Sequence, residues 1–177
     1  DGGSAKNASF HTISDIYADD KGNIYIADSI NRNIRKIDKQ GIISTVAEKS
    51  LVSLGAEVHP NGIIIDKAGN LFFSDSGGSK LYQIDSNGNI KTIGGTGDFE
   101  DHGDGGPALK AGLRSPGGLA IGPDGALHVA EQTTHRIRRI GLNGVIASYA
   151  GNGKPGYSGD GGPAVKANIK SPFRMMF

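Results

Sequence analysis

Three acidic residues stand at the same point of three similar segments, where they could do catalytic or metal-binding work. Asp28, Asp75 and Glu131 each end a short apolar run, and they are 47 and 56 residues apart. If the segments surround a common axis, the carboxylates would form a ring suited to a divalent metal or to general-base chemistry. The alternative is that each acid accepts hydrogen bonds from backbone N–H groups of the loop that follows it. We favour this alternative, because each acid lies in a separate segment and Glu131 departs from the Asp of the other two.

Two further groups have the chemistry of metal ligands. Asp98, Asp101 and Asp104 crowd one glycine-rich linker, and clustered oxygen ligands on a flexible loop suit calcium. The aligned later linker keeps only the last of these acids, Asp160, which argues against a calcium site built into the repeat. His59 stands at the entry to a predicted strand, where it could join a zinc site if two more ligands converged from other segments. We therefore expect no cofactor, with calcium or zinc as the alternative.

The loops that follow the three acids differ between segments, while the apolar runs stay alike. Variable loops on a repeated rigid scaffold are typical recognition sites. We expect ligand contacts from the loop residues Asn31, Arg32, Ser79, Thr134 and His135. Arg32, Ser79 and His135 occupy the same aligned position of the three loops. Simple solvation of polar loop residues is the alternative explanation.

The elements that must position these residues are short strands joined by glycine turns. The run Asn-Ile-Tyr-Ile-Ala-Asp at 23–28 returns in similar form at 70–75 and at 126–131. Turns such as Asp20-Lys21-Gly22 join neighbouring runs, because glycine readily takes the positive φ that tight hairpin turns require. The pattern predicts four strands per period, at residues 15–18, 23–28, 33–37 and 42–47, then 62–65, 70–75, 80–84 and 89–94, then 118–121, 126–131, 136–140 and 145–150.

The predicted second strands carry apolar residues on both faces, as Ile24 and Ile26 on one face and Tyr25 on the other illustrate. A sheet of this kind is packed between two neighbouring sheets. Four antiparallel strands per period with both faces covered are typical of a β-propeller blade. A sandwich has no reason to repeat, and a parallel solenoid has shorter rungs without two hairpin turns per period.

We therefore predict a single all-β domain at residues 1–177, a β-propeller of four-stranded antiparallel blades. The repeats are expected at about 13–59, 60–115 and 116–171, with a partial repeat at 172–177 that supplies the first strand of a fourth blade, and with residues 1–12 as the end of a preceding linker. Because three blades leave two open flanks and sheet edges, we expect a segment of a longer propeller. Self-association through the open edges is the alternative.

Composition argues against several classes of function. Lys and Arg number 19 and Asp and Glu number 18, so no overall field would attract nucleic acid or an anionic membrane. The absence of cysteine excludes a disulfide framework and cysteine-ligated zinc. No apolar run reaches the roughly 20 residues needed to span a bilayer, and we expect no membrane insertion. The third strands of two repeats carry basic residues that could contact single-stranded RNA, namely Arg35, Lys36, Arg136, Arg138 and Arg139. The third strand of the middle repeat has Tyr82 and Gln83 in their place.

The run at 25–37, which ends in Asn33-Ile34-Arg35-Lys36-Ile37, and the stretch His135-Arg136-Ile137-Arg138-Arg139-Ile140 resemble the NHL repeat. The Gly-Asp-Gly-Gly-Pro-Ala linkers at 103–108 and 159–164 resemble the long-linker variety of bacterial NHL proteins. The resemblance covers essentially the whole chain. It implies a secreted or periplasmic bacterial propeller that has six blades in the longer parent protein. It departs at Glu131 and at Gly77-Gly78-Ser79-Lys80, where the usual Asp and the His-Arg pair are replaced.

The resemblance implies a non-catalytic scaffold that binds a protein, peptide or glycan through its rim loops. Rigid blades would hold those loops in place before the ligand arrives. One alternative is a six-bladed lyase or lactonase with a divalent metal in the central channel. Another is the extracellular sensor domain of a larger receptor or kinase.

Overall fold

A computed structural model describes residues 1–47, 51, 54 and 58–177. In these residues the chain forms three antiparallel sheets of four strands each, and every sheet uses four strands that are consecutive in the sequence. The strands are β1 (Ile13–Ala18), β2 (Ile24–Asp28), β3 (Asn33–Ile37), β4 (Ile43–Thr45), β5 (Pro60–Ile65), β6 (Leu71–Asp75), β7 (Lys80–Ile84), β8 (Ile90–Gly94), β9 (Pro116–Ile121), β10 (Leu127–Glu131), β11 (Arg136–Ile140) and β12 (Ile146–Ala150).

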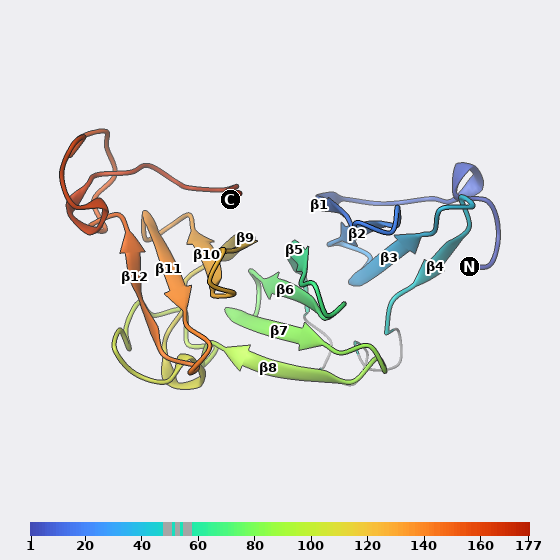
Figure 1. Cartoon of the computed structure of the whole chain (residues 1–177), viewed down its shortest axis with the longest axis horizontal. Helices are drawn as coiled ribbons and strands as arrows, with labels where there is room; N and C mark the ends of the chain where they lie inside the picture. The colour runs from blue at the N-terminus through green and yellow to red at the C-terminus, as the bar shows by residue number, and fades with distance from the viewer. Residues whose placement is uncertain (48–50, 52–53, 55–57) are drawn as a thin grey trace.

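The three sheets stand around a common centre, as Figure 1 shows. The first strand of each sheet, β1, β5 or β9, lies innermost, and the last strand, β4, β8 or β12, lies outermost. Adjacent innermost strands contact one another, β1 with β5 and β5 with β9. The predicted all-β propeller with three four-stranded blades is therefore confirmed.

Apolar side chains hold neighbouring blades together face to face. One buried cluster joins the first and second blades and includes Ile34, Leu71 and Phe73. A second cluster joins the second and third blades and includes Leu81 and Val129. The middle blade thus buries apolar residues on both faces, as the sequence predicted.

The linker before the third blade contributes to this packing. It contains the 3-10 turn η2 (Ala108–Lys110), and Ala108, Ala111 and Leu113 are buried in the cluster between the second and third blades. Similar turns are η1 (Ala5–Asn7) and η3 (Ala164–Lys166), neither of which has a buried residue. The linker turn therefore fills the space between two blades.

The same linkers extend the sheets by pairing with their outermost strands. The N–H of Gly105 donates to the carbonyl of Ile146 in β12 at 2.8 Å, and the N–H of Ile146 donates to the carbonyl of Gly106 at 3.0 Å. The start of the chain repeats this pairing, since Gly2 donates to the carbonyl of Ile43 in β4 at 2.8 Å. These segments cover the outer edges of β4 and β12.

The chain segments beside β9 approach it so closely that only glycine fits at two positions. A Cβ on Gly62 of β5 would lie 2.4 Å from the carbonyl oxygen of Gly117 in β9. A Cβ on Gly118 would lie 2.1 Å from the carbonyl oxygen of Phe173. Both distances are far below van der Waals contact, so these glycines allow the blades to converge.

Residues 172–177 lie beside β9, where the first strand of a further blade is predicted. The N–H of Gly118 donates to the carbonyl of Phe173 at 3.1 Å, but these residues form no strand. Arg174 forms an ion pair with Asp15 of β1.

No helix in the described part of the chain is long and apolar enough to cross a membrane.

Candidate ligand-binding site

The aligned acids at the ends of β2 and β6 are buried and hydrogen-bonded to backbone. Asp28 accepts hydrogen bonds from the N–H groups of His11 and Thr12, each with an oxygen at 3.2 Å. Asp75 accepts from the N–H of His59 at 3.1 Å and from that of Gly78 at 3.0 Å. Each acid thereby fixes the chain that enters its blade, and Asp75 also fixes the loop after its own strand. The expected bonds from backbone N–H groups of the following loop are confirmed for Asp75, while Asp28 accepts backbone N–H groups of the chain before its blade.

The third acid, Glu131, does the same work and also contacts a buried arginine. Its Oε1 accepts from the N–H of Arg114 at 2.7 Å, and its Oε2 lies 3.4 Å from Nη1 of Arg138. Burial raises the pKa of Glu131 from its ordinary 4.5 to about 7, although the Arg114 N–H and the Arg138 charge act in the opposite direction. Arg138 is only 1% exposed and makes two shorter ion pairs, with Asp101 at 3.2 Å and Asp104 at 2.6 Å.

These ion pairs account for two of the predicted calcium ligands. Asp101 and Asp104 anchor the linker to β11 through Arg138, and Asp101 also pairs with Arg136 at 2.8 Å. Asp98 pairs with His102 at 3.0 Å, and the hydrogen bond from that ring lowers the pKa of Asp98 to about 2. In the described part of the chain, no three metal-binding side chains come together. The calcium site stays a prediction.

The equivalence of Arg32, Ser79 and His135 is a backbone property. All three residues adopt the left-handed conformation, with φ values of 57°, 51° and 55°. The loop between the second and third strands of each blade needs one such residue to turn back into the sheet. Their shared position therefore follows from turn geometry and does not by itself indicate ligand contact.

The side chains of the predicted loop contacts differ in whether the protein itself bonds to them. Asn31 is exposed, and its Nδ2 donates to Asp28 Oδ2 at 2.8 Å. Thr134 and Ser79 are buried, and neither hydroxyl has a hydrogen-bond partner among the described residues. Nδ1 of His135 accepts from the N–H of Ser171 at 3.1 Å. Ligand contact by these five residues stays a prediction.

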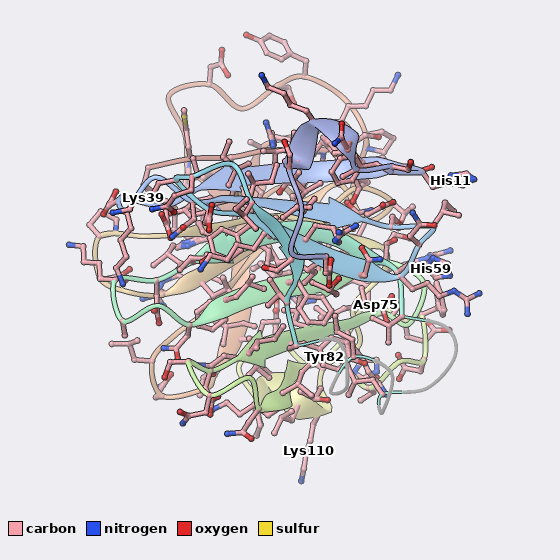
Figure 2. All side chains as sticks on the ribbon, turned by 90° about the vertical axis from the view of Figure 1, so that its right-hand side faces the viewer. His11, Lys39, His59, Asp75, Tyr82 and Lys110 are labelled. Carbon is pink, nitrogen blue, oxygen red and sulfur yellow. The ribbon has the colours of Figure 1, made fainter. Side chains whose placement is uncertain are left out.

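The structure instead brings together the first residues of the same loops. A pocket of about 460 Å³, here called the central pocket, opens between the three blades and is lined by Ser29, His59, Asn61, Ser76, Gly77, Phe99, Ser115 and Gln132. His59 and Asp75 lie on one side of the molecule, and Lys39, in a turn between third and fourth strands, lies on the opposite side (Figure 2). The central pocket therefore belongs to the face that carries the loops after the acids.

The lining of the central pocket contains no Asp, Glu, Lys or Arg side chain and is rich in hydrogen-bonding groups. Nδ2 of Asn61 donates to Oγ of Ser76 at 3.3 Å, while Oδ1 of Asn61 is buried without a partner among the described residues. Nδ1 of His59 lies 3.3 Å from the carbonyl oxygen of Ser29. A buried amide oxygen without a hydrogen bond is costly, so Asn61 keeps an unused acceptor in the wall of the pocket.

A larger pocket of about 1070 Å³ opens at the opposite end of the centre. Its walls come from β1, β5 and β9, from the turns that follow them, and from residues 174–177. Asp15 on its wall is engaged, since it accepts from the N–H of Ile63 at 3.0 Å and pairs with Arg174.

Sequence reasoning named His59 and placed recognition in the loops after the three acids, which supply part of the central pocket, but it chose other residues of those loops as ligand contacts. One signal was available: the first residue of each loop is an uncharged hydrogen-bonding residue, namely Ser29, Ser76 and Gln132. The contributions of Asn61 and Phe99 had no such signal, because they depend on how neighbouring blades and linkers meet in space.

A family model for the SMP-30/gluconolactonase/LRE-like region matches residues 4–150. The chain belongs to this family. A comparison with curated protein sequences gives no match. The family match agrees with the predicted propeller, while the finer assignment to NHL repeats stays a prediction.

Solved structures similar to this member of the SMP-30/gluconolactonase/LRE-like family share its fold at low sequence identity. A structural genomics protein of unknown function from Bacteroides thetaiotaomicron has a TM-score of 0.77 and 19% identity, over 92% of this chain and 41% of that one. An auxiliary nutrient binding protein from the same organism has a TM-score of 0.67 and 15% identity, over 89% and 40%. Virginiamycin B lyase from Staphylococcus aureus has a TM-score of 0.57 and 21% identity, over 76% and 39%. The chain thus spans about two fifths of the length of these structures.

Proposed function

We propose that this chain is part of a non-catalytic, NHL-type propeller that binds a protein, peptide or glycan in and around the central pocket. The observation that carries the proposal is the lining of that pocket, in which hydroxyl, amide and imidazole groups from three blades converge. Such convergent polar groups in a concave site are typical of ligand recognition.

The state of the aligned acids supports binding over catalysis. General-base chemistry needs a carboxylate within hydrogen-bond reach of a substrate. The carboxylates of Asp28, Asp75 and Glu131 are buried and accept hydrogen bonds from the chain itself. They therefore hold the loops in a fixed arrangement, which lowers the ordering cost of binding.

The comparisons support both a binding and a catalytic reading. One similar structure is named as an auxiliary nutrient binding protein and another as a lyase. The family description, which includes gluconolactonase, favours as a second candidate a lyase or lactonase that uses a divalent metal. His59 is the one predicted metal ligand that lines the central pocket.

The test combines ligand screening with two pocket variants. Labelled protein is applied to immobilised glycans and peptides, and Asn61→Ala and Ser76→Ala are compared with Ser86→Ala, which alters an exposed serine of the turn between β7 and β8. We expect the wild-type protein to bind at least one probe, the two pocket variants to bind it at least about tenfold more weakly, and Ser86→Ala to bind as the wild type does.

Metal analysis of the same preparation distinguishes the second candidate. A stoichiometric divalent ion that survives dialysis, together with turnover of a lactone that is lost in His59→Ala, would replace the binding proposal by the enzymatic one. Probe binding that is equally strong in all three variants would remove the central pocket from the proposal.

A further inference from the structure

Phe99 has a backbone conformation that its side chain disfavours. Its φ is 57°, in the left-handed region; the residue is 47% exposed and lines the central pocket. A bulky residue in this region is strained and persists only where the surroundings impose the conformation. The aligned residue of the third linker is Pro155, so this conformation is not part of the repeat.

The residues on either side of Phe99 hold the turn in place. Asp98 Oδ1 accepts from the N–H of Glu100 at 3.1 Å, and Asp98 Oδ2 lies 3.0 Å from Nε2 of His102. Asp101 forms an ion pair in which its Oδ1 lies 3.2 Å from Nη1 of Arg138. The aromatic ring is thus presented from a linker that is fixed on both sides of it.

The composition of the pocket around Phe99 narrows the class of ligand. Ser76, Ser115 and Gln132 offer hydroxyl and amide groups, and Asn61 offers a buried amide oxygen without a partner among the described residues. An ionised ligand would find no fixed opposite charge in this lining, and burying an unpaired charge is costly. An apolar ring beside uncharged hydrogen-bonding groups matches a molecule with one apolar face and a polar edge.

We propose that Phe99 is the stacking platform for an uncharged sugar ring whose hydroxyl groups are recognised by Asn61 and the serines of the central pocket. This inference rests on the proposed function and names the ligand class of the same site. The C–H face of a pyranose would cover the exposed face of the Phe99 ring. Its hydroxyl edge would point toward the amide and hydroxyl groups of β5, β6 and the adjoining loops.

The test uses Phe99→Gly, because glycine adopts a φ of 57° without strain and the variant should fold at least as stably as the wild type. Phe99→Tyr keeps a ring of similar size. Tyr157→Ala is the matched control, since Tyr157 is an aromatic of the third linker that is 89% exposed and does not line the pocket. Binding of maltotetraose, cellotetraose, xylotetraose and chitotetraose is measured by calorimetry beside an uncharged tetrapeptide.

We expect at least one oligosaccharide to bind, Phe99→Gly to bind it at least about tenfold more weakly, and Phe99→Tyr and Tyr157→Ala to bind it within about threefold of the wild type. Oligosaccharide binding that Phe99→Gly leaves unchanged would overturn the inference. Binding of the peptide alone, with loss in Asn61→Ala, would overturn the inference and leave the proposed function standing. If neither sugars nor peptide bind, the inference and the central pocket as a binding site both fail.

Discussion

At the scale of single residues, carboxylates that resemble catalytic groups are used to hold the chain together. Asp28 and Asp75 are buried but accept several N–H groups, which compensates for the loss of water. Glu131 has one such N–H and a distant guanidinium, so desolvation dominates and the pKa of Glu131 rises to about 7.

The raised pKa of Glu131 predicts a dependence of stability on pH. Between pH 4.5 and pH 7 the folded state holds a proton on Glu131 that the unfolded state has lost, so the free energy of unfolding should fall by up to about 1.4 kcal/mol per pH unit from this group. The contribution is fully present below pH 4.5 and lost above pH 7. Urea denaturation at several pH values should show this fall in the wild type but not in Glu131→Gln.

The wild type must be compared with Glu131→Gln because His128 changes the free energy of unfolding with pH in the opposite direction. Burial lowers the pKa of His128 below its ordinary 6.5, so its contribution to stability grows with pH in an overlapping window. Parallel curves for wild type and Glu131→Gln across pH 4.5–7 would contradict the prediction for Glu131.

At the scale of elements, the linkers join their blades through a repeated ion pair. Asp104 pairs with Arg138 at 2.6 Å and accepts from the hydroxyl of Ser148 at 2.6 Å. The equivalent Asp1 pairs with Arg35 at 2.7 Å and accepts from the N–H of Thr45 at 3.0 Å. Both arginines occupy the same aligned position of their third strands, so the Asp-Gly-Gly linker and the arginine form one structural unit.

The repeated unit predicts that two aligned substitutions lower the free energy of unfolding by different amounts. Asp104→Ala should lower the free energy of unfolding by about 1–2 kcal/mol, because the buried Arg138 loses its shortest ion pair. Asp160→Ala should change it by less than about 0.5 kcal/mol, since Asp160 is exposed and its recorded contact is a 3.4 Å hydrogen bond from the hydroxyl of Tyr157. Chemical denaturation of both variants tests this, and equal costs would show that the ion pair does not stabilise the linker.

The strands could be predicted closely from the sequence, and the ligand pocket could not. The third strands at 33–37, 80–84 and 136–140 coincide with the prediction, because alternating apolar residues and glycine turns define them locally. The first strands begin two residues earlier than predicted, at Ile13 in the first blade, where the glycine and apolar pattern gives no signal. The central pocket depends on loops of three blades meeting and on the backbone of Phe99, which no local pattern specifies.

At the scale of the whole molecule, the two outer flanks of the three-bladed unit expose apolar side chains that resemble its interior. Ile16 of β1 is 50% exposed on one flank, and Phe177, beside the third blade, is 62% exposed. The equivalent faces between blades are closed by buried apolar clusters. Exposed apolar surfaces of this kind favour association.

The exposed flanks predict self-association of this chain in solution. We expect sedimentation analysis to show particles heavier than 18.3 kDa as the concentration rises. Ile16→Asp should shift the distribution toward the monomer, because a charge on the flank would have to be desolvated on contact. Leu142→Asp serves as the control, since Leu142 is 84% exposed on a turn and not on a strand. A monomer at every concentration tested would rule out association through the flanks.

The linker pairing along β4 and β12 limits the form that such association can take. The backbone N–H and carbonyl of Ile43 in β4 are bonded to Gly3 and Gly2, and those of Ile146 in β12 are bonded to Gly106 and Gly105. Unprotected ladder groups are the template on which amyloid fibrils recruit further chains. The linkers therefore occupy the outer edge at the first residue of β4 and of β12, and a fibril that grew from either end of these strands would first have to displace them.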